Sequence, residues 1–599
     1  MVSLVSFLHC SCFSLIYNNI QLTKKRRNRT AILLIIASVA VLIFCCFSVW
    51  VSLTYKKYIH AHLNEWVLKA SDSVYYATIQ DISINFFTRS ISISGIKLLP
   101  DTNAVNYHKE TGATHKVNVT LSIAKLQLSS IAWTKLLSDK ELSCGEVNIW
   151  HPEVLIVSKR RIPDSSKIEP EKESDPAIKK IYAGRINIMD PDISFHAYAG
   201  DGDSSTCQLK GGLATLQEWL WDKDKKDSTG FLLARSATID SSSFTFIKPD
   251  KLYILRVAAL YFNTEQHSLF LSKLLLNPTV DRETFYRILG HQQTIWNMAV
   301  PSVSFSDLNW QKLLHAGEFC SATVDINKPN INLYFSYLVP VDPSNKIKFD
   351  PIKLLHNCPL GVNVKTVSVK DGSIYYTELN DQSKRTGTLA VEKINAQADN
   401  VVNIKSLIAL NKTCTIKADA MLQHKSPTTA SMLLSLDDSL GEFTIKGELS
   451  KLDATQVSSL AESLDLFRVD SLHLSSFKVS IHGNQNFTHE EQTVLYTDLK
   501  IELEKHTDSN EVKVKPIPSA VANAFFVYPS NPSPGKPVRT ATTDMRRDTQ
   551  RAFISMVVEN VKCGAKEIVV KNEDIAPMKK DKNQIPQKKG FFRKLFGRK

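Results

Sequence analysis

The stretch that decides the fold runs from Trp133 to Val157 and reads WTKLLSDKELSCGEVNIWHPEVLIV. The chain repeats this stretch from Trp310 as WQKLLHAGEF and from Val324 as VDINKPNI. The identical or similar positions, all at an offset of 177, are Trp133, Lys135, Leu136, Leu137, Glu141, Val147, Ile149 and Pro152. Agreement at one fixed offset over so many positions indicates an internal repeat.

A shorter template recurs inside this repeat. With Val147 as position 0, apolar residues stand at positions 0, 2, 7 and 9, and a turn-forming residue stands at position 5. The copies are Val147, Ile149, Pro152, Val154, Ile156; Ile186, Ile188, Pro191, Ile193, Phe195; Val324, Ile326, Pro329, Ile331, Leu333; and Val367, Val369, Gly372, Ile374, Tyr376, with a weaker copy from Ala237 to Phe246. Period-two alternation is typical of strands with one apolar face, and Pro or Gly favours a turn. The template therefore predicts repeated β-hairpins.

The repeat extends upstream of the template. Residues 79–157 and 257–335 correspond at offsets of 177 to 178, and Asn85 matches Asn263. In each block we expect a strand, then a short helical turn at the Trp-x-Lys-Leu-Leu motif, then a hairpin. Units of this kind stack side by side and share one core, so this length need not mean several separate domains.

The N-terminal region predicts a membrane anchor. Residues 31–53 are uncharged and span roughly 34 Å as a helix, enough to cross a bilayer. Five basic residues from Lys24 to Arg29 precede this segment, and fewer follow it, so we expect residues 1–30 to be cytoplasmic and the rest to be exported. Residues 1–23 lack the basic start of a signal peptide. Residues 54–78 have the apolar stripe of a juxtamembrane helix.

Composition excludes several function classes. The formal charge of +13 gathers near the two ends of the chain, which suits a membrane surface better than nucleic acid. The chain has no CxxC pair, phosphate-binding glycine loop, GxSxG or HExxH motif, so we expect no nucleotide, no metal, no cofactor and no enzyme activity. The dispersed cysteines favour buried free thiols over disulfides. We expect Leu213–Trp221 to form a short amphipathic helix, and His489-Glu490-Glu491 to lie in a polar, solvated loop.

Several C-terminal motifs resemble the AsmA-like family of Gram-negative bacteria. The similar features are a strand ending in Gly447, the Leu452-Asp453-Ala454 entry to a short helix, a Tyr496-Thr497-Asp498-Leu499-Lys500 strand, and Arg546-Arg547-Asp548 after an Asn-Pro pair. The chain departs from the family pattern at Asp470-Ser471, where a glycine is usual. The resemblance covers most of the chain from Ala31 onward. It implies a protein of the bacterial inner membrane with one transmembrane pass and a periplasmic β-groove, whose larger relatives bridge two membranes and conduct phospholipids.

Together these observations predict a mainly β fold: an elongated, repeated β-hairpin sheet curved into a groove, with short helices, after one N-terminal transmembrane helix. The expected segments are the groove domain at 79–505, a strand and helix region at 506–570, and a basic tail at 571–599. A closed β-sandwich with a dry core is the structural alternative. Membrane phospholipids are the expected partners of the groove.

Two sets of residues follow as candidate sites. The expected groove face comprises Val147, Ile149, Val154, Ile156, Ile186, Ile188, Ile193, Val324, Ile326, Ile331, Val367, Val369 and Ile374. The expected membrane contact at the C-terminus comprises Phe591, Phe592, Arg593, Lys594, Phe596 and Arg598, whose aromatic rings and charges suit an anionic bilayer; a soluble tail is the alternative. The functional alternative to lipid transport or outer-membrane homeostasis is a closed scaffold that binds an envelope protein through a sheet edge. An exported hydrolase is a more distant alternative.

Overall fold

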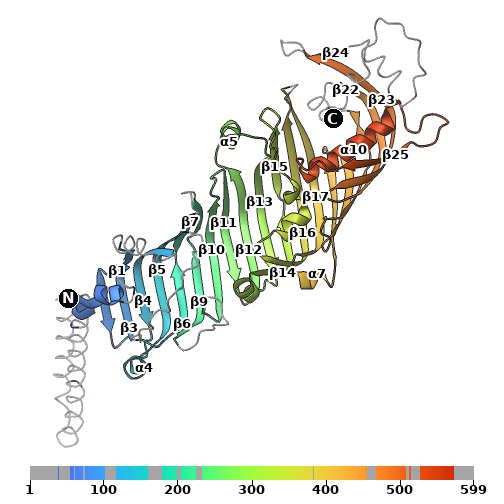
Figure 1. Cartoon of the computed structure of the whole chain (residues 1–599). Helices are drawn as coiled ribbons and strands as arrows, with labels where there is room; N and C mark the ends of the chain where they lie inside the picture. The colour runs from blue at the N-terminus through green and yellow to red at the C-terminus, as the bar shows by residue number, and fades with distance from the viewer. Residues whose placement is uncertain are drawn as a thin grey trace, which may run out of the picture.

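A computed structural model describes residues 38, 54, 56–59, 61–69, 71, 74–101, 117–159, 178–198, 204–223, 233–381, 384–454, 467–506, 512–514 and 527–571. These residues are mainly β and form one long mixed sheet, with its strands side by side (Figure 1). This confirms the mainly β class predicted from the alternation. The sheet extends from the N-terminal strands at one end to the C-terminal strands at the other.

The first part of the sheet comprises β1 (Tyr75–Thr78), β2 (Asp81–Asn85), β3 (Ser90–Pro100), β4 (Val117–Ser129), β5 (Glu141–Lys159), β6 (Lys180–Met189), β7 (Asp192–Tyr198), β8 (Ser204–Lys210), β9 (Leu213–Asp222), β10 (Ser236–Ile247), β11 (Tyr253–Asn263) and β12 (Ser268–Pro278). The second part comprises β13 (Ile295–Ser306), β14 (Glu318–Asn327), β15 (Asn330–Ser336), β16 (Gly361–Leu379), β17 (Thr386–Val402), β18 (Thr413–Leu422), β19 (Ser426–Ser435), β20 (Phe443–Leu449), β21 (Leu452–Asp453), β22 (Phe467–Gly483), β23 (Phe487–His506), β24 (Val512–Val514) and β25 (Thr540–Arg546). The helical elements are α4 (Trp133–Ser138), α5 (Arg282–Leu289), η1 (Lys312–Ala316), η2 (Ile347–Phe349), α6 (Pro351–His356), α7 (Lys405–Ile408) and α10 (Phe553–Val569).

Strand order in space follows strand order in the chain almost throughout. Most neighbours are antiparallel, whereas β5 runs parallel to β6 and β7, and β16 runs parallel to β14 and β15. Some consecutive strands lie end to end against one shared neighbour, such as β6 and β7 on β5. Because each such pair takes up one position in the ladder, the sheet extends roughly 90 Å at about 4.8 Å per strand.

The repeat in the sequence is also a repeat in the structure. Strand β3 corresponds to β12, β4 to β13, β5 to β14 plus β15, and α4 to η1. A pair of side-chain hydrogen bonds to the backbone repeats as well. The Asn85 side chain accepts from the amides of Phe87 and Thr88 at 2.9 and 3.0 Å, and the Asn263 side chain accepts from the amides two and three residues later at the same distances. Two copies of one sequence pattern thus form the same local structure.

The prediction that each copy of the template forms a hairpin is wrong. Strands β5 and β16 each run through their whole copy, and β6 and β7 continue in one direction along β5. Position 4 is left-handed in all copies, with φ of 46° to 60° at His151, Asp190, Ser241, Lys328 and Asp371. One extra residue at a bulge moves all later side chains to the opposite face of a strand. The apolar residues at positions 0, 2, 7 and 9 therefore share one face without any turn.

These irregularities form a line across the sheet, which we call the crease. In neighbouring strands the left-handed residues lie at the same position along the strands. Each stands between two residues that the register pairs with residues of the next strand. The crease comprises Gly95, His151, Asp190, Gly212, Ser241, Lys273, Lys328, Asp371 and Lys393. Because a bulge bends its strand, aligned bulges are expected to bend the sheet along its length.

Two further predictions are corrected. Residues Leu213–Trp221 lie within strand β9, paired with β6 and β10, and do not form a helix. The triplet from His489 to Glu491 lies within β23 and not in a loop. Residues 56–59 and 61–69 are helical, whereas β1, at the end of the segment predicted as the juxtamembrane helix, already belongs to the sheet.

Candidate functional site: an apolar lane along the sheet

One face of the sheet carries an unbroken row of apolar side chains. Cross-strand neighbours lie on the same face of a sheet and contact each other, so the strand register identifies the row directly. We call it the apolar lane; it comprises Ile82, Ile93, Leu126, Ile149, Ile188, Ala214, Ile239, Phe262, Leu269, Phe305, Val324, Val367, Ala398, Ile416, Met432, Ile445 and Ile481. It reaches from the N-terminal edge strand β2 to β22.

The structure brings the predicted groove residues together in pairs. The paired neighbours are Val147 with Ile186, Ile149 with Ile188, Val154 with Ile193, Ile156 with Phe195, Val324 with Val367, Ile326 with Val369, and Ile331 with Ile374. They form two groups, one on β5 to β7 and one on β14 to β16. The residues that connect the groups were missing from the prediction: Ala214, Ile239, Phe262, Leu269 and Phe305. For Phe262 and Leu269 the signal was the second block of the repeat, where they match Ile84 and Ile91.

The side chains of the apolar face are less exposed than those of an ordinary surface and less buried than those of a closed core. Val324 is 8% exposed, whereas the other predicted groove residues are half-buried. Small clusters bury part of the face: Val300, Val303, Val324 and Val364 form one in the middle of the sheet. Among the described strands, β2 and β25 form the two ends of a single open sheet and do not pair with each other. Part of the apolar surface of the lane is therefore left exposed, outside any closed core.

The opposite face is mixed: it carries hydrogen-bonded polar side chains together with exposed apolar ones such as Tyr261, Phe270 and Leu433. Between β5 and β6, the Asn187 side-chain amide donates to Glu146 Oε1 at 2.7 Å and to Asn148 Oδ1 at 2.8 Å. Along the crease, His151 Nδ1 lies 2.8 Å from Asp190 Oδ2, and Lys328 Nζ lies 3.8 Å from Asp371 Oδ2. The lane face thus has a continuous apolar row, whereas hydrogen-bonding side chains interrupt the apolar residues of the other face.

The C-terminal end of the lane meets a buried carboxyl group. Ile481 pairs with Glu490 of β23, and the next apolar row ends where Val479 pairs with Gln492. Glu490 is 0% exposed and Gln492 is 1% exposed. Helix α10 packs over β23 and β25 there (Figure 1). Burial raises the pKa of Glu490 to about 7, although hydrogen bonds from Thr543 and the Gly564 amide oppose that shift.

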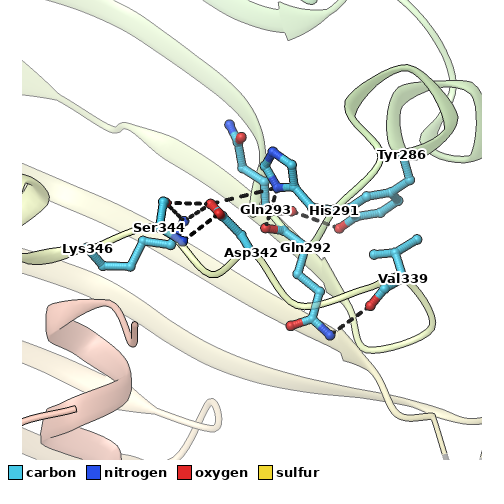
Figure 2. Close-up of polar contacts among 8 residues, drawn as sticks. All are labelled: Tyr286, His291, Gln292, Gln293, Val339, Asp342, Ser344 and Lys346. Atoms are coloured by element: carbon cyan, nitrogen blue, oxygen red, sulfur yellow. Dashed lines mark hydrogen bonds and ion pairs between the residues drawn. The ribbon is translucent and has the colours of Figure 1, made fainter. Parts of the chain in front are cut away.

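A polar cluster beside α5 contains residue types that recur in catalysis (Figure 2). The Asp342 carboxylate accepts from the Ser344 amide at 2.9 Å, from the Ser344 hydroxyl at 2.8 Å, and from Lys346. His291 Nδ1 lies 3.8 Å from the same carboxylate. The Lys346 contact holds the pKa of Asp342 well below its usual range.

The geometry of this cluster does not suit a Ser-His-Asp mechanism. The Ser344 hydroxyl donates to the carboxylate, whereas a nucleophilic serine would donate to the imidazole. Nearby, Gln292 bonds Val339 and Pro340 through its side chain and backbone, and the Tyr286 hydroxyl donates to the Gln293 carbonyl at 2.9 Å. These contacts fasten the connection after β15 to the loop after α5, which is a structural role.

The predicted membrane-contact residues, 591–598, lie outside the described residues, as does the span 31–53 apart from Ser38. Within the described ranges, every helix is too short or too polar to span a bilayer. The described cysteines are free thiols: Cys144, Cys320 and Cys414 are buried, and Cys207, Cys358 and Cys563 are half-buried.

Comparisons with known proteins add no identification. A scan against family models finds no matching family, and a search of curated proteins finds no match. The resemblance to AsmA-like proteins therefore stays a prediction.

Proposed function

We propose that this protein binds phospholipid acyl chains along the apolar lane and lets them move lengthwise over the sheet. The observation that carries the proposal is the lane itself: an uninterrupted apolar row, half-buried over most of its length, that crosses the sheet from β2 to β22. A closed protein core would be expected to bury these side chains more completely.

The physical basis is transfer of hydrocarbon from water. Each methylene buried against such a face contributes about 0.8 kcal/mol. The apolar band on one strand extends, for example, from Leu269 to Leu276 in β12, which is roughly 24 Å at the rise of a β-strand. Because successive strands offer chemically similar surface, an acyl chain would meet similar free energies at each step, which favours movement over tight capture.

The surroundings of the lane belong to the same proposal. Residues 31–53 would anchor the chain in the bacterial inner membrane with the N-terminus in the cytoplasm, and the sheet would lie in the periplasm. The aligned bulges of the crease support a sheet bent into a groove, with the apolar lane on its inner wall. The basic tail would contact an anionic membrane through Phe591, Phe592, Arg593, Lys594, Phe596 and Arg598.

The test is lipid analysis of the full chain purified in detergent, with mass spectrometry of the bound species. Val367→Asp places a charge in the lane, and Ser368→Asp places the same charge one residue further along β16, on the opposite face. Both positions are half-buried. We expect phospholipid to co-purify with the wild-type chain and with Ser368→Asp, and to be lost from Val367→Asp.

Equal lipid loss in both variants would contradict the proposal, as would a lipid-free wild-type protein. A wild-type chain that carries an envelope protein instead of lipid would favour the scaffold alternative. Circular dichroism of each variant checks that the sheet has formed.

A further inference from the structure

The apolar lane ends at a carboxylic acid that is enclosed on all sides by described residues. Glu490 Oε2 accepts from the Thr543 hydroxyl at 2.8 Å. With the Gln492 amide nitrogen facing Glu490, that nitrogen donates to Oε1 at 2.7 Å and to the Val561 carbonyl of α10 at 3.2 Å. Among the ion pairs of the described residues, none includes Glu490. An ionised carboxylate at this place would be buried without a counter-ion, which is costly.

Helix α10 closes over this acid at very short range. A Cβ on Gly564 would stand 2.9 Å from the amide atom of Gln492 that faces Glu490 and 3.0 Å from Glu490 Oε2, so the helix approaches as closely as a glycine allows. One turn earlier, the buried Asn560 side chain accepts from the Thr488 hydroxyl at 2.8 Å and donates to the Met556 carbonyl at 2.9 Å. The helix therefore docks on a polar seam that has Glu490 at its centre.

The titratable groups around Glu490 do not neutralise its charge. From α10, Glu567 acts on it by repulsion, and Cys563 is the other titratable side chain that interacts with it electrostatically. From β22 and β25 it meets Ile481 and Thr543, which do not titrate. His489, Glu491, His482 and Asp544 lie on the other face of these strands, because side chains alternate along a strand.

We propose that α10 is a proton-sensitive cover over the C-terminal end of the apolar lane, docked while Glu490 is protonated and loosened when Glu490 ionises. The inference goes beyond the lipid proposal, since it concerns the docking of the helix alone. Opening would expose Ile481 of β22 and Met556 of α10 itself, which are buried in the same apolar cluster. If the lane carries lipid, this cover would regulate its exit.

The sign follows from linkage. The pKa of Glu490 is raised from 4.5 to about 7 in the docked state, so the docked state binds more protons than the open one between these values. The docked state is favoured at low pH, and its advantage declines as pH rises through this window, by up to tenfold per pH unit. Above about pH 7, both states are ionised and the dependence ends.

The experiment is hydrogen exchange of the full chain in detergent micelles from pH 4.5 to pH 8.5, read on peptides of α10 and corrected for intrinsic rates. We expect the protection of α10 to fall at least tenfold over this range in the wild-type chain. Glu490→Gln keeps the shape and removes the titration, so its protection should stay constant. Glu491→Gln removes a charge from the other face of the same strand and should follow the wild type.

A wild-type profile independent of pH would overturn the inference, and so would a Glu490→Gln profile that still falls. Thr543→Val provides a second test if Glu490→Gln does not fold. It removes a hydrogen bond that favours the ionised acid, so the midpoint of the fall should move to higher pH. An unchanged midpoint in this variant would also contradict the proposal.

Discussion

Two consecutive glycines at the crease allow a stringent test of the bulge geometry. Gly211 and Gly212 connect β8 to β9, and both have φ of 77°. A Cβ on Gly212 would stand 2.2 Å from the Asp240 carbonyl oxygen and 2.8 Å from the Ser242 nitrogen, both backbone atoms of β10. A Cβ on Gly211 would meet nothing closer than Asp190 Oδ1, at 3.7 Å. The two sites share a φ of 77° and differ in the space around them.

Alanine substitution at each position separates the two costs. A left-handed conformation costs a residue with a Cβ about 1–2 kcal/mol, and this applies to both sites. Gly212→Ala must in addition displace the backbone of β10, and overpacking of this kind costs about 1–3 kcal/mol. We therefore expect Gly212→Ala to destabilise the sheet by about 2–5 kcal/mol and Gly211→Ala by about 1–2 kcal/mol.

Hydrogen exchange on peptides of β9 and β10 measures this difference locally, which suits a stacked sheet that need not unfold in one step. The expected result is a loss of protection that is roughly tenfold or more greater in Gly212→Ala than in Gly211→Ala. Equal losses in the two variants would refute the close approach of β10 to this turn, and with it the geometry of the crease.

Two further predictions concern buried groups. The Arg547 side chain is 0% exposed and donates to Asp350 Oδ1 at 2.9 Å, joining α6 to the end of β25. Because Asp350→Asn leaves this buried guanidinium unpaired, it should lower the free energy of unfolding in urea by about 3–5 kcal/mol. The double variant Asp350→Asn/Arg547→Met should be less destabilised than Asp350→Asn alone, and a greater loss would contradict this reasoning. Burial raises the pKa of the Cys144 and Cys414 thiols to about 11. At pH 8, roughly one such thiol in a thousand is therefore ionised in the folded chain, and the ionised thiol is the form that reacts. We expect iodoacetamide to label both cysteines at least a hundredfold more slowly in the folded chain than in urea. Similar labelling rates in the two conditions would show that these strands do not enclose their cysteines.

The sequence predicts the class of the fold because alternation and duplication are local signals. Apolar residues at every second position identify strands, and the fixed offset identifies the paired blocks that β3 to β5 and β12 to β15 then form. The path of the chain at the template was harder to predict from the sequence. A tight turn and a bulge both shift the alternation by one residue, and Pro152 suits either. The choice depends on β6 and β7, which run parallel to β5 and are distant in the sequence from its β4 partner.

Long-range packing also explains the other differences. Leu213, Leu216 and Leu220 have helical spacing, but β9 is held between β6 and β10 and therefore extends as a strand. Glu490 resembles a solvated charge between His489 and Glu491, because its cover comes from α10, about seventy residues later in the chain. The groove residues on β5 to β7 and β14 to β16 were accessible from the template, whereas the row that joins them required the strand register.

The most direct measurement of the central claim is photocrosslinking from both faces of the sheet. A photoreactive amino acid is placed in the apolar lane at Leu126, Phe305 or Ile416, and at the adjacent residues Gln127, Ser304 or Thr415 on the opposite face; all six positions are half-buried. After illumination in membranes of the expression host, mass spectrometry identifies the adducts. Lipid adducts at all three lane positions and none at their neighbours are the predicted result. Equal adducts on both faces, or protein adducts alone in the lane, would contradict the account.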